Sequence, residues 1–531
     1  MSPSLASVGG AMLLRKLLPL PVIALAGSVS GVELPTMFGN HAVLQRGEAV
    51  PVWGWATPSE SVKVSFAGQS KQAVANEKGE WRIELAPMKA NVKGRELVVT
   101  GSKSGPVTVS DLLVGEVWMA SGQSNMQWAL SATERAKEDI PKATFPAVRM
   151  FLTDLVTAAT PQRRVGGKWH ETNPENAGKF SAVGYYFALN LHTELGVPVG
   201  IIRTAWGGKP SEAFTSRETL SSKPEGKALI EKLDQEMKRF DAGKAKANYE
   251  KKLAAWEAIR KANQAEPDPK KRVKLGRRPG KPAAPALSPN RPMSIYHGMI
   301  HPWVGYAMKG AIWYQGESNA RRAKEYETIF PLLILDWRRQ WQKELPYYFV
   351  QLANFRKPST DPGTPDSWAE LQNAQRLTLS LPKTGMAVIN DIGTANNIHP
   401  PNKKDVGERL ARWALAQDYG KKDVVVCGPL FKAAKNEGGK IRISFEHARG
   451  LKSRDAKPLA RFEIAGEDKI WHWADAAIES ETVLVSSKDV PKPVAVRYAW
   501  ASNPEGANLI NSEGLPASLF RTDEWKLSTE R

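Results

Sequence analysis

Residues 112–126 read LLVGEVWMASGQSNM, and this stretch decides the fold. Its first nine residues form an almost continuous apolar run, which is typical of a strand buried on both faces of a parallel sheet. Gly122 permits a tight turn, and Ser124 follows just past the end of the strand. Ligands bind outside the carboxyl ends of strands in such sheets. The stretch predicts a serine presented to a cleft, although a serine there can also simply begin a helix.

Strands and helices alternate on the C-terminal side of this stretch, which predicts an α/β domain over residues 111–427. Strand-like runs occur at VPVGIIRTAW (197–206), KGAIWYQG (309–316), YYFVQLANF (347–355) and TGMAVIND (384–391). Helical patterns occur at SAVGYYFALNLHTEL (181–195), YETIFPLLILDWRRQW (326–341) and KKDVGERLARWALAQ (403–417).

The segments on either side have the short, regularly spaced apolar runs of all-β domains. Residues 32–110 contain runs such as VPVWGWA and SVKVSFAG, which predict an N-terminal β-sandwich. Residues 428–531 contain GKIRISFEH and TVLVSS, which predict a second β-rich domain. Residues 1–31 combine Arg15 and Lys16 with the apolar run LLPLPVIALAG, as in a signal peptide. We therefore expect export to the periplasm or beyond, with no membrane association after cleavage.

Positive charge is concentrated in one segment of the chain. The formal net charge is +19, and residues 221–290 alone carry 18 Lys and Arg against 9 Asp and Glu. No nucleic-acid-binding motif accompanies this segment, so nucleic acid is not an expected partner. Apolar residues recur at helical spacing from Leu229 to Ile259, which predicts a helical hairpin packed through its apolar stripes. The Pro-, Gly- and Lys-rich residues that follow predict a mobile loop. A solvated insertion and a surface for an acidic glycan both fit this composition.

Three further segments bring polar groups to the edge of the sheet where Ser124 lies. Gly207 and Gly208 follow the strand at 197–206, and QGESN (315–319) follows the strand at 309–316. Asp391 ends the strand at 384–391, and His399 stands eight residues later. A serine, two loops with free amides and a histidine are the components of acyl transfer. The single cysteine and the absence of metal-ligand spacings predict neither a metal site nor a cofactor.

The motifs GQSNM, WGG, WYQGESNA and IHPPNKKDVGERL resemble the sequence blocks of the sialate O-acetylesterase family, within the SGNH/GDSL-like carbohydrate esterases. The opening LPTMFGNHAVLQRGEAVPVWGWA and the closing VAVRYAW and NSEGLPASLFRTD resemble the ends of that family. The likeness covers nearly the whole chain after residue 31, except the basic insertion. It implies an SGNH-type parallel-sheet hydrolase domain between the two β-rich domains.

The resemblance also implies roles for individual residues. Ser124 corresponds to the nucleophile and His399 to the general base. The backbone amides of Ser124 and Gly208, with the side-chain amide of Gln315, would form the oxyanion hole. We expect Glu317, Asn319 and Trp206 to contact the substrate, with a structural role as the alternative for Glu317.

The sequence departs from the family pattern beside the histidine. Many members carry an aspartate two or three residues before it, where this chain has Asn396 and Asn397. Asp391 could take the place of the missing acid, or a backbone carbonyl could orient the ring of His399 and leave a Ser–His dyad. The seven other histidines lie outside these motifs.

The expected function is hydrolysis of O-acetyl esters on a glycan, as in sialate O-acetylesterases. Two alternatives remain at this point. The chain could be an acetyl xylan or pectin-type esterase, or a glycan-binding relative that has lost turnover. The sequence does not specify the sugar or the oligomeric state.

Overall fold

The computed structural model describes residues 31–530, and at its centre lies a mostly parallel β-sheet. The order of its strands is β13, β12, β11, β7, β10, β8 and β9, and only β9 runs antiparallel to its neighbour. The strands are β7 (Pro106–Gly122), β8 (Phe145–Thr153), β9 (Gly167–Thr172), β10 (Val199–Arg203), β11 (Gly310–Tyr314), β12 (Tyr347–Val350) and β13 (Thr384–Ala387). The predicted mixed α/β fold is therefore confirmed. The predicted signal peptide lies outside the described residues, except for Gly31.

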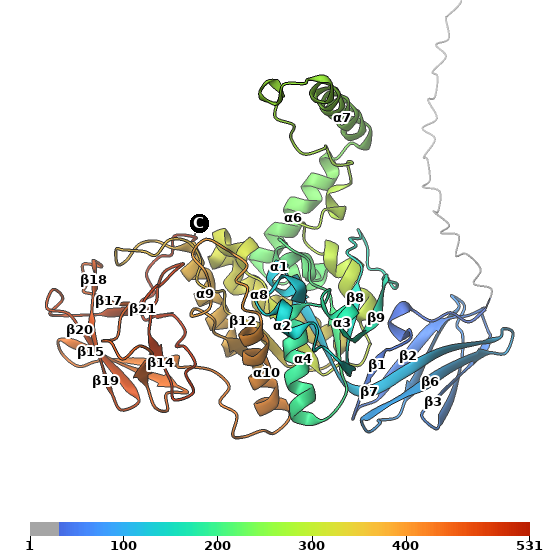
Figure 1. Cartoon of the computed structure of the whole chain (residues 1–531), viewed down its shortest axis with the longest axis horizontal. Coiled ribbons are helices and arrows are strands. Elements are labelled where there is room, and N and C mark those ends of the chain that lie inside the picture. Colours follow the sequence, from blue (N-terminus) through green and yellow to red (C-terminus); the bar gives the residue numbers. More distant parts are fainter. Residues whose placement is uncertain (1–30, 531) are drawn as a thin grey trace, which may run out of the picture.

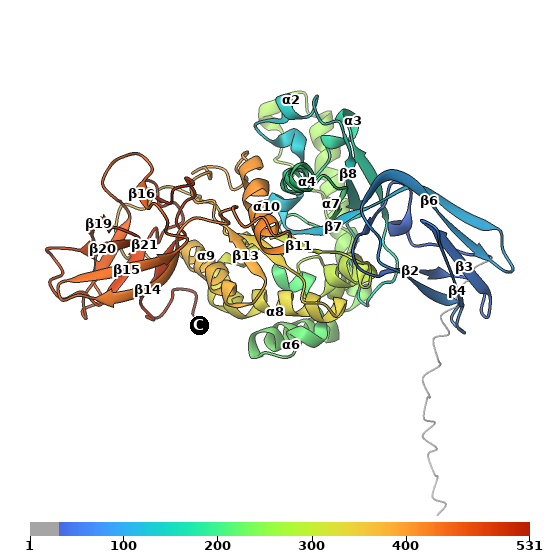
Figure 2. The same ribbon diagram turned by 90° about the horizontal axis from the view of Figure 1, so that it is seen from below.

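Helices cover both faces of this sheet (Figure 2). On one face α4 (Ala182–Leu195) packs against α10 (Lys404–Asp418), and on the other lie α8 (Ala323–Trp341) and α9 (Ser367–Leu377). The hydroxyl of Ser181 caps α4 by accepting a hydrogen bond from the amide of Gly184, and Gly196 ends the helix in a left-handed conformation. The short helices are α1 (Ser124–Gln127), α2 (Ala136–Asp139), α3 (Pro174–Ala177) and α5 (Arg217–Leu220).

Strand β7 continues from the central sheet into the N-terminal group of strands (Figure 1). Its first half pairs with β6 and its second half pairs with β10 and β11. Exposure alternates over residues 106–111, and every residue from Leu112 to Gly122 is buried. The composition change near Asp111, where we predicted a domain boundary, thus lies inside one strand. The other strands of this group are β1 (Val43–Gln45), β2 (Val50–Trp55), β3 (Ser61–Phe66), β4 (Gln69–Val74), β5 (Glu80–Leu85) and β6 (Asn91–Gly101).

A C-terminal group of antiparallel strands has its own apolar core, which includes Ile443, Phe462 and Phe520. One sheet contains β14 (Leu430–Asn436), β15 (Lys440–Glu446), β20 (Thr482–Ser486) and β19 (Asp475–Glu479). The other contains β18 (Trp471–Trp473), β17 (Phe462–Ala465), β21 (Ala495–Tyr498) and β23 (Phe520–Arg521), and β16 (Lys452–Ser453) pairs with β22 (Leu509–Ile510).

The basic insertion forms two helices, but they do not pack together as predicted. Helix α6 (Pro224–Arg239) buries Ile230 and Leu233 in a small core that α8 also lines. Helix α7 (Ala242–Ala265) has no buried residue and stands clear of the rest of the molecule (Figure 1). The prediction failed because the chain after α7 returns along it and partly covers its apolar residues. Trp256 Nε1 donates a hydrogen bond to the carbonyl of Gly276 at 2.7 Å.

Within residues 31–530, no helix is both long enough and apolar enough to cross a bilayer.

Candidate active site

Ser124 and His399 meet at the carboxyl edge of the central sheet. Ser124 is the first residue of α1, directly after β7, and His399 lies in the loop between β13 and α10. His399 Nε2 lies 2.8 Å from Ser124 Oγ, within hydrogen-bond distance, and both side chains are half-buried. Gly122 makes this geometry possible, because a Cβ there would lie 2.2 Å from the carbonyl oxygen of Tyr314. The pair has the contact that a serine nucleophile and its base require.

The ring of His399 is stacked on Trp128. The two ring centroids are 4.6 Å apart and the planes differ by 17°. Among residues 31–530, none forms a hydrogen bond with Nδ1 of His399. Asn397, near the position of the missing acid, accepts a hydrogen bond from the backbone amide of His399 at 2.9 Å. Asn397 therefore shapes the loop backbone, and Trp128 fixes the plane of the ring.

Two backbone amides near the serine are free to bind an oxyanion. The amides of Ser124 and Gly208 form no hydrogen bond with any residue from 31 to 530. A Cβ on Gly207 would lie 3.3 Å from the Cβ of Ser124, so the glycine loop packs directly against the nucleophile. Gly208 is exposed, with φ of 69° and open space where a Cβ would be. Free amides beside a serine can stabilise the negative charge of a tetrahedral intermediate.

Gln315 and Asn319 are held inside the protein. Gln315 Nε2 donates to Asn319 Oδ1 at 2.6 Å and to the carbonyl of Lys209 at 3.3 Å, and its Oε1 accepts from Tyr326 at 2.9 Å. Asn319 Nδ2 donates to Glu212 Oε2 at 2.9 Å. Both amides are almost completely buried. The side chains of both residues are therefore occupied in hydrogen bonds that hold neighbouring loops together. The sequence had instead predicted Gln315 as an oxyanion donor and Asn319 as a substrate contact. Trp206 is half-buried near Lys209, with the Nζ of that lysine 5.9 Å from its ring.

A chain of buried polar groups holds the histidine loop on both sides of His399. Asn125 Nδ2 donates to the carbonyl of Ile398 at 3.0 Å and to Glu317 Oε1 at 2.6 Å. Lys403 Nζ donates to the carbonyl of Pro400 and to Asn125 Oδ1, each at 2.6 Å. The residues before and after His399 are thus tied to the residue that follows Ser124. Sequence reasoning missed these roles, although Asn125 and Lys403 lie inside two of the quoted motifs.

The same groups set the electrostatics of the site. Lys403 is 1% exposed, and burial lowers its pKa to about 7, with nearby Glu317 opposing the shift. Burial raises the pKa of Glu317, whose Oε2 has no hydrogen-bond partner among the described residues. Burial, and then the positive charge of Lys403, lower the pKa of His399. A lowered pKa keeps the imidazole neutral, as a general base must be, to a lower pH than an ordinary histidine.

Asp391 pairs with Arg409 of α10 and forms no hydrogen bond with His399. Its two carboxylate oxygens lie 2.6 Å and 2.8 Å from the two terminal nitrogens of Arg409. The carbonyl of Val388 accepts a further hydrogen bond from the same guanidinium at 2.7 Å. The structure thus brings Ser124 and His399 together but does not bring Asp391 to them.

A cavity of about 640 Å³ opens beside the glycine loop. Gly208 and Ser318 line it together with Leu229, Lys232 and Leu233 of α6, and Glu212, Glu236 and Glu325 also belong to its lining. Its volume falls in the range of about 300–1,000 Å³ that is usual for ligand sites. The first helix of the basic insertion therefore forms a wall next to the catalytic loops.

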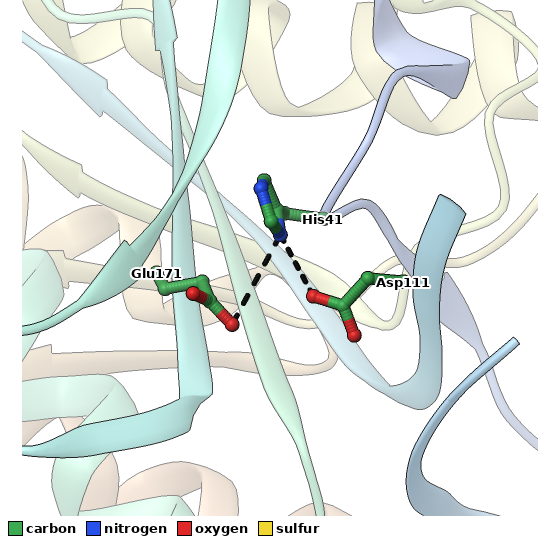
Figure 3. Close-up of side chains that lie close together, drawn as sticks. All are labelled: His41, Asp111 and Glu171. Carbon is green, nitrogen blue, oxygen red and sulfur yellow. Dashed lines mark hydrogen bonds and ion pairs between the residues drawn. The ribbon is translucent and has the colours of Figure 1, made fainter. Parts of the chain in front are cut away.

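A histidine and two carboxylates also meet outside this site, where the N-terminal strands join the central sheet (Figure 3). His41 Nδ1 lies 2.7 Å from Asp111 Oδ2 and 4.0 Å from Glu171 Oε1. Arg149 Nη2 donates to the same two oxygens, at 2.8 Å and 3.2 Å. A cation bound there would have to displace a guanidinium that cannot lose its charge. We therefore interpret the cluster as an ion-pair network that links β8 and β9 to the N-terminal strands.

Known proteins resemble this chain in sequence and in architecture. Residues 290–416, which include His399 and Lys403, match the family described as carbohydrate esterase, sialic acid-specific acetylesterase. The sialate O-acetylesterases of Mus musculus and Homo sapiens are 28% and 26% identical to this chain. Those alignments cover 92% and 94% of this chain and 94% and 93% of the relatives.

The crystal structure of a carbohydrate acetylesterase from Xanthomonas citri has a TM-score of 0.78 and 36% sequence identity, and the match covers 93% of this chain and 100% of that one. The chain therefore belongs to this family of carbohydrate esterases, and it is a carboxylic ester hydrolase.

Proposed function

We propose that this protein removes O-acetyl groups from sugars through a serine esterase mechanism with a Ser124–His399 dyad. The observation that carries the proposal is the 2.8 Å contact between Ser124 Oγ and His399 Nε2 at the sheet edge. The family membership supports acetylated carbohydrate as the substrate class, and the sialate O-acetylesterases among the relatives support sialic acid as its sugar.

The reaction proceeds in two steps. His399 takes the proton of Ser124 while Oγ attacks the acetyl carbonyl, and the amides of Ser124 and Gly208 hold the resulting oxyanion. The carbonyl re-forms as the bond to the sugar oxygen breaks, and His399 returns the proton to that oxygen. This leaves an acetyl group on Ser124. Water, activated by His399, then attacks the acetyl group, releases acetate and restores the serine.

Trp128 takes over part of the role of the missing acid. When His399 accepts the proton it becomes a cation, and this cation lies against the face of an indole at a centroid distance of 4.6 Å. Cations within about 6 Å of an indole face are attracted by roughly 0.5–2 kcal/mol. The stacking therefore orients the ring and favours its protonated form in the transition state, where no carboxylate of residues 31–530 binds Nδ1.

Acetate release from defined glycans tests the proposed function. We expect the full chain to release acetate from O-acetylated sialic acid, and Ser124→Ala to release none above the uncatalysed rate. Acetylated xylan and acetylated galacturonan serve as parallel substrates. Release of acetate from only acetylated xylan or only acetylated galacturonan, and not from sialic acid, would reassign the sugar. Failure to release acetate from any of the three substrates would contradict the proposal.

Replacing Lys403 with methionine is expected to move the acid limb of the kcat/KM profile to higher pH. The charge of Lys403 lowers the pKa of His399. Its removal lets that pKa rise, so the base becomes protonated at a higher pH and activity is lost earlier as the pH falls. Hydrolysis of 4-nitrophenyl acetate between about pH 5 and pH 9 measures this limb.

Lys404→Met is the matched control, because Lys404 is partly exposed and pairs with Glu408 at 3.7 Å. The control should keep the acid limb of the unmodified protein. If the acid limb also stays in place in Lys403→Met, the charge of Lys403 does not affect the pKa of His399.

A further inference from the structure

Beyond α6, the insertion forms a projecting basic arm, which we define as residues 241–284. It consists of α7 and the chain that returns along it (Figure 1). Residues 241–281 carry thirteen Lys and Arg against five Asp and Glu. The arm buries no residue of α7 in the core, so folding does not account for its composition.

Most of this charge is not neutralised within the protein. Three of the thirteen cations have carboxylate partners, and these are Lys244, Lys246 and Arg278, at 3.8–3.9 Å. The other ten are exposed and form no ion pair with any residue from 31 to 530. They are Lys251, Lys252, Arg260, Lys261, Lys270, Lys271, Arg272, Lys274, Arg277 and Lys281. Concentrated unpaired charge of one sign attracts ligands of the opposite sign and speeds their encounter.

The arm follows a helix that lines the cavity beside the glycine loop. Helix α6 runs directly into α7, and its residues Leu229, Lys232 and Leu233 line the cavity that begins at Gly208. Lys232 is exposed and has no ion-pair partner among the described residues. The cavity lining also contains Glu212 and Glu236, which pair with Arg322 and Arg291. A chain-like substrate bound beside Gly208 would therefore meet α6 first and the arm beyond it.

We propose that the basic arm binds a carboxylated polysaccharide and holds it across the cavity beside the glycine loop that packs against Ser124. This inference rests on the proposed function, because it assigns the polymer context of the acetylated sugar. A polysaccharide with sugar carboxylates offers repeated negative charges to the ten cations, and Lys232 adds a further unpaired cation on the cavity wall. A nucleic acid is a poorer match, because the aromatic residues of α7, Tyr249 and Trp256, are half-buried and offer no open stacking surface.

The test uses the full chain and de-esterified polygalacturonate as the probe. The arm variant changes Lys251, Lys270, Lys271, Lys274 and Arg277 to glutamine. The control variant removes the same charge from the C-terminal group of strands by changing Lys432, Lys452, Lys457, Lys488 and Lys492, all exposed, to glutamine. At about 50 mM salt the arm variant should bind roughly tenfold more weakly, and the control should stay within about twofold of the unmodified protein. At about 500 mM salt, screening should remove the difference.

Several results would overturn the proposal. Equal weakening in both variants would assign binding to net charge alone. Equally tight binding of single-stranded DNA, or binding to vesicles of anionic lipid without binding to polygalacturonate, would assign the arm to another partner. Turnover of 4-nitrophenyl acetate should be the same in all three proteins. Absence of that turnover in the unmodified protein would refute the proposed function, and the binding measurement would still decide the role of the arm.

Discussion

Replacing Ser124 with alanine is expected to lower kcat for 4-nitrophenyl acetate by on the order of 10⁴-fold or more, because the attacking oxygen is removed. His399→Ala should cost a similar factor, since no other group from residue 31 to 530 forms a hydrogen bond with Ser124 Oγ and could take its proton. The double variant should lose no more than either single one, because the two residues act as one unit. Initial rates under saturating ester measure all three.

The fold should survive these changes. Within the described part of the chain, the hydroxyl of Ser124 has one hydrogen-bond partner, His399, and the serine lies at the first position of α1 and not in the core. Ser131→Ala, at an exposed serine in the short helical turn Leu130–Ala132, should keep full activity. Retention of more than about a tenth of the rate in folded Ser124→Ala would exclude Ser124 as the nucleophile.

Replacing Asp391 with asparagine is expected to destabilise the protein while leaving kcat within about threefold. The change removes the carboxylate that binds Arg409 through two hydrogen bonds, and leaves a guanidinium that is 12% exposed with only the more distant Asp405 nearby. Losing one partner of such a pair should cost about 2–4 kcal/mol. Removing the charge of a true triad acid instead lowers kcat by roughly 10⁴-fold. Thermal unfolding and ester kinetics on the same preparation separate the two outcomes.

Asp405→Asn is the matched control, because Asp405 lies 4.0 Å from Arg409 and is 39% exposed. It should change neither the unfolding temperature nor the rate by much. If Asp391→Asn remains folded and loses about a thousandfold or more in kcat, the dyad is incorrect and Asp391 acts on His399.

Much of the central sheet could be predicted from the sequence. The apolar runs that predicted strands became β7, β10, β11, β12 and β13, and the periodic segments became α4, α8 and α10. The meeting of Ser124 with His399 could also be predicted, because parallel strands bring their carboxyl ends to one edge whatever lies between them. The continuity of β7 could not be predicted. A change from an alternating to a continuous apolar pattern looks the same in a sequence whether it lies within one strand or at a domain boundary.

The roles of individual side chains depended on partners that are far away in the chain. Asp391 lies near the predicted edge, but Arg409 on the next helix takes its carboxylate. Gln315 follows β11 directly, and its amide turns inward to Tyr326. Lys403 contacts Asn125 across 278 residues of sequence, and no local pattern reports such a contact. Such contacts depend on how the elements pack in three dimensions, which periodicity and motif spacing do not report.

The central claim is that Ser124 is the nucleophile that His399 activates. The most direct measurement is the site of reaction with an organophosphate ester that modifies activated serines, located by mass spectrometry of the digested protein. The unmodified protein should carry one adduct, on the peptide that contains Ser124, with activity lost in proportion. His399→Ala should carry almost none. An adduct on another residue that accounts for the lost activity, or equal labelling of Ser124 in His399→Ala, would contradict the dyad.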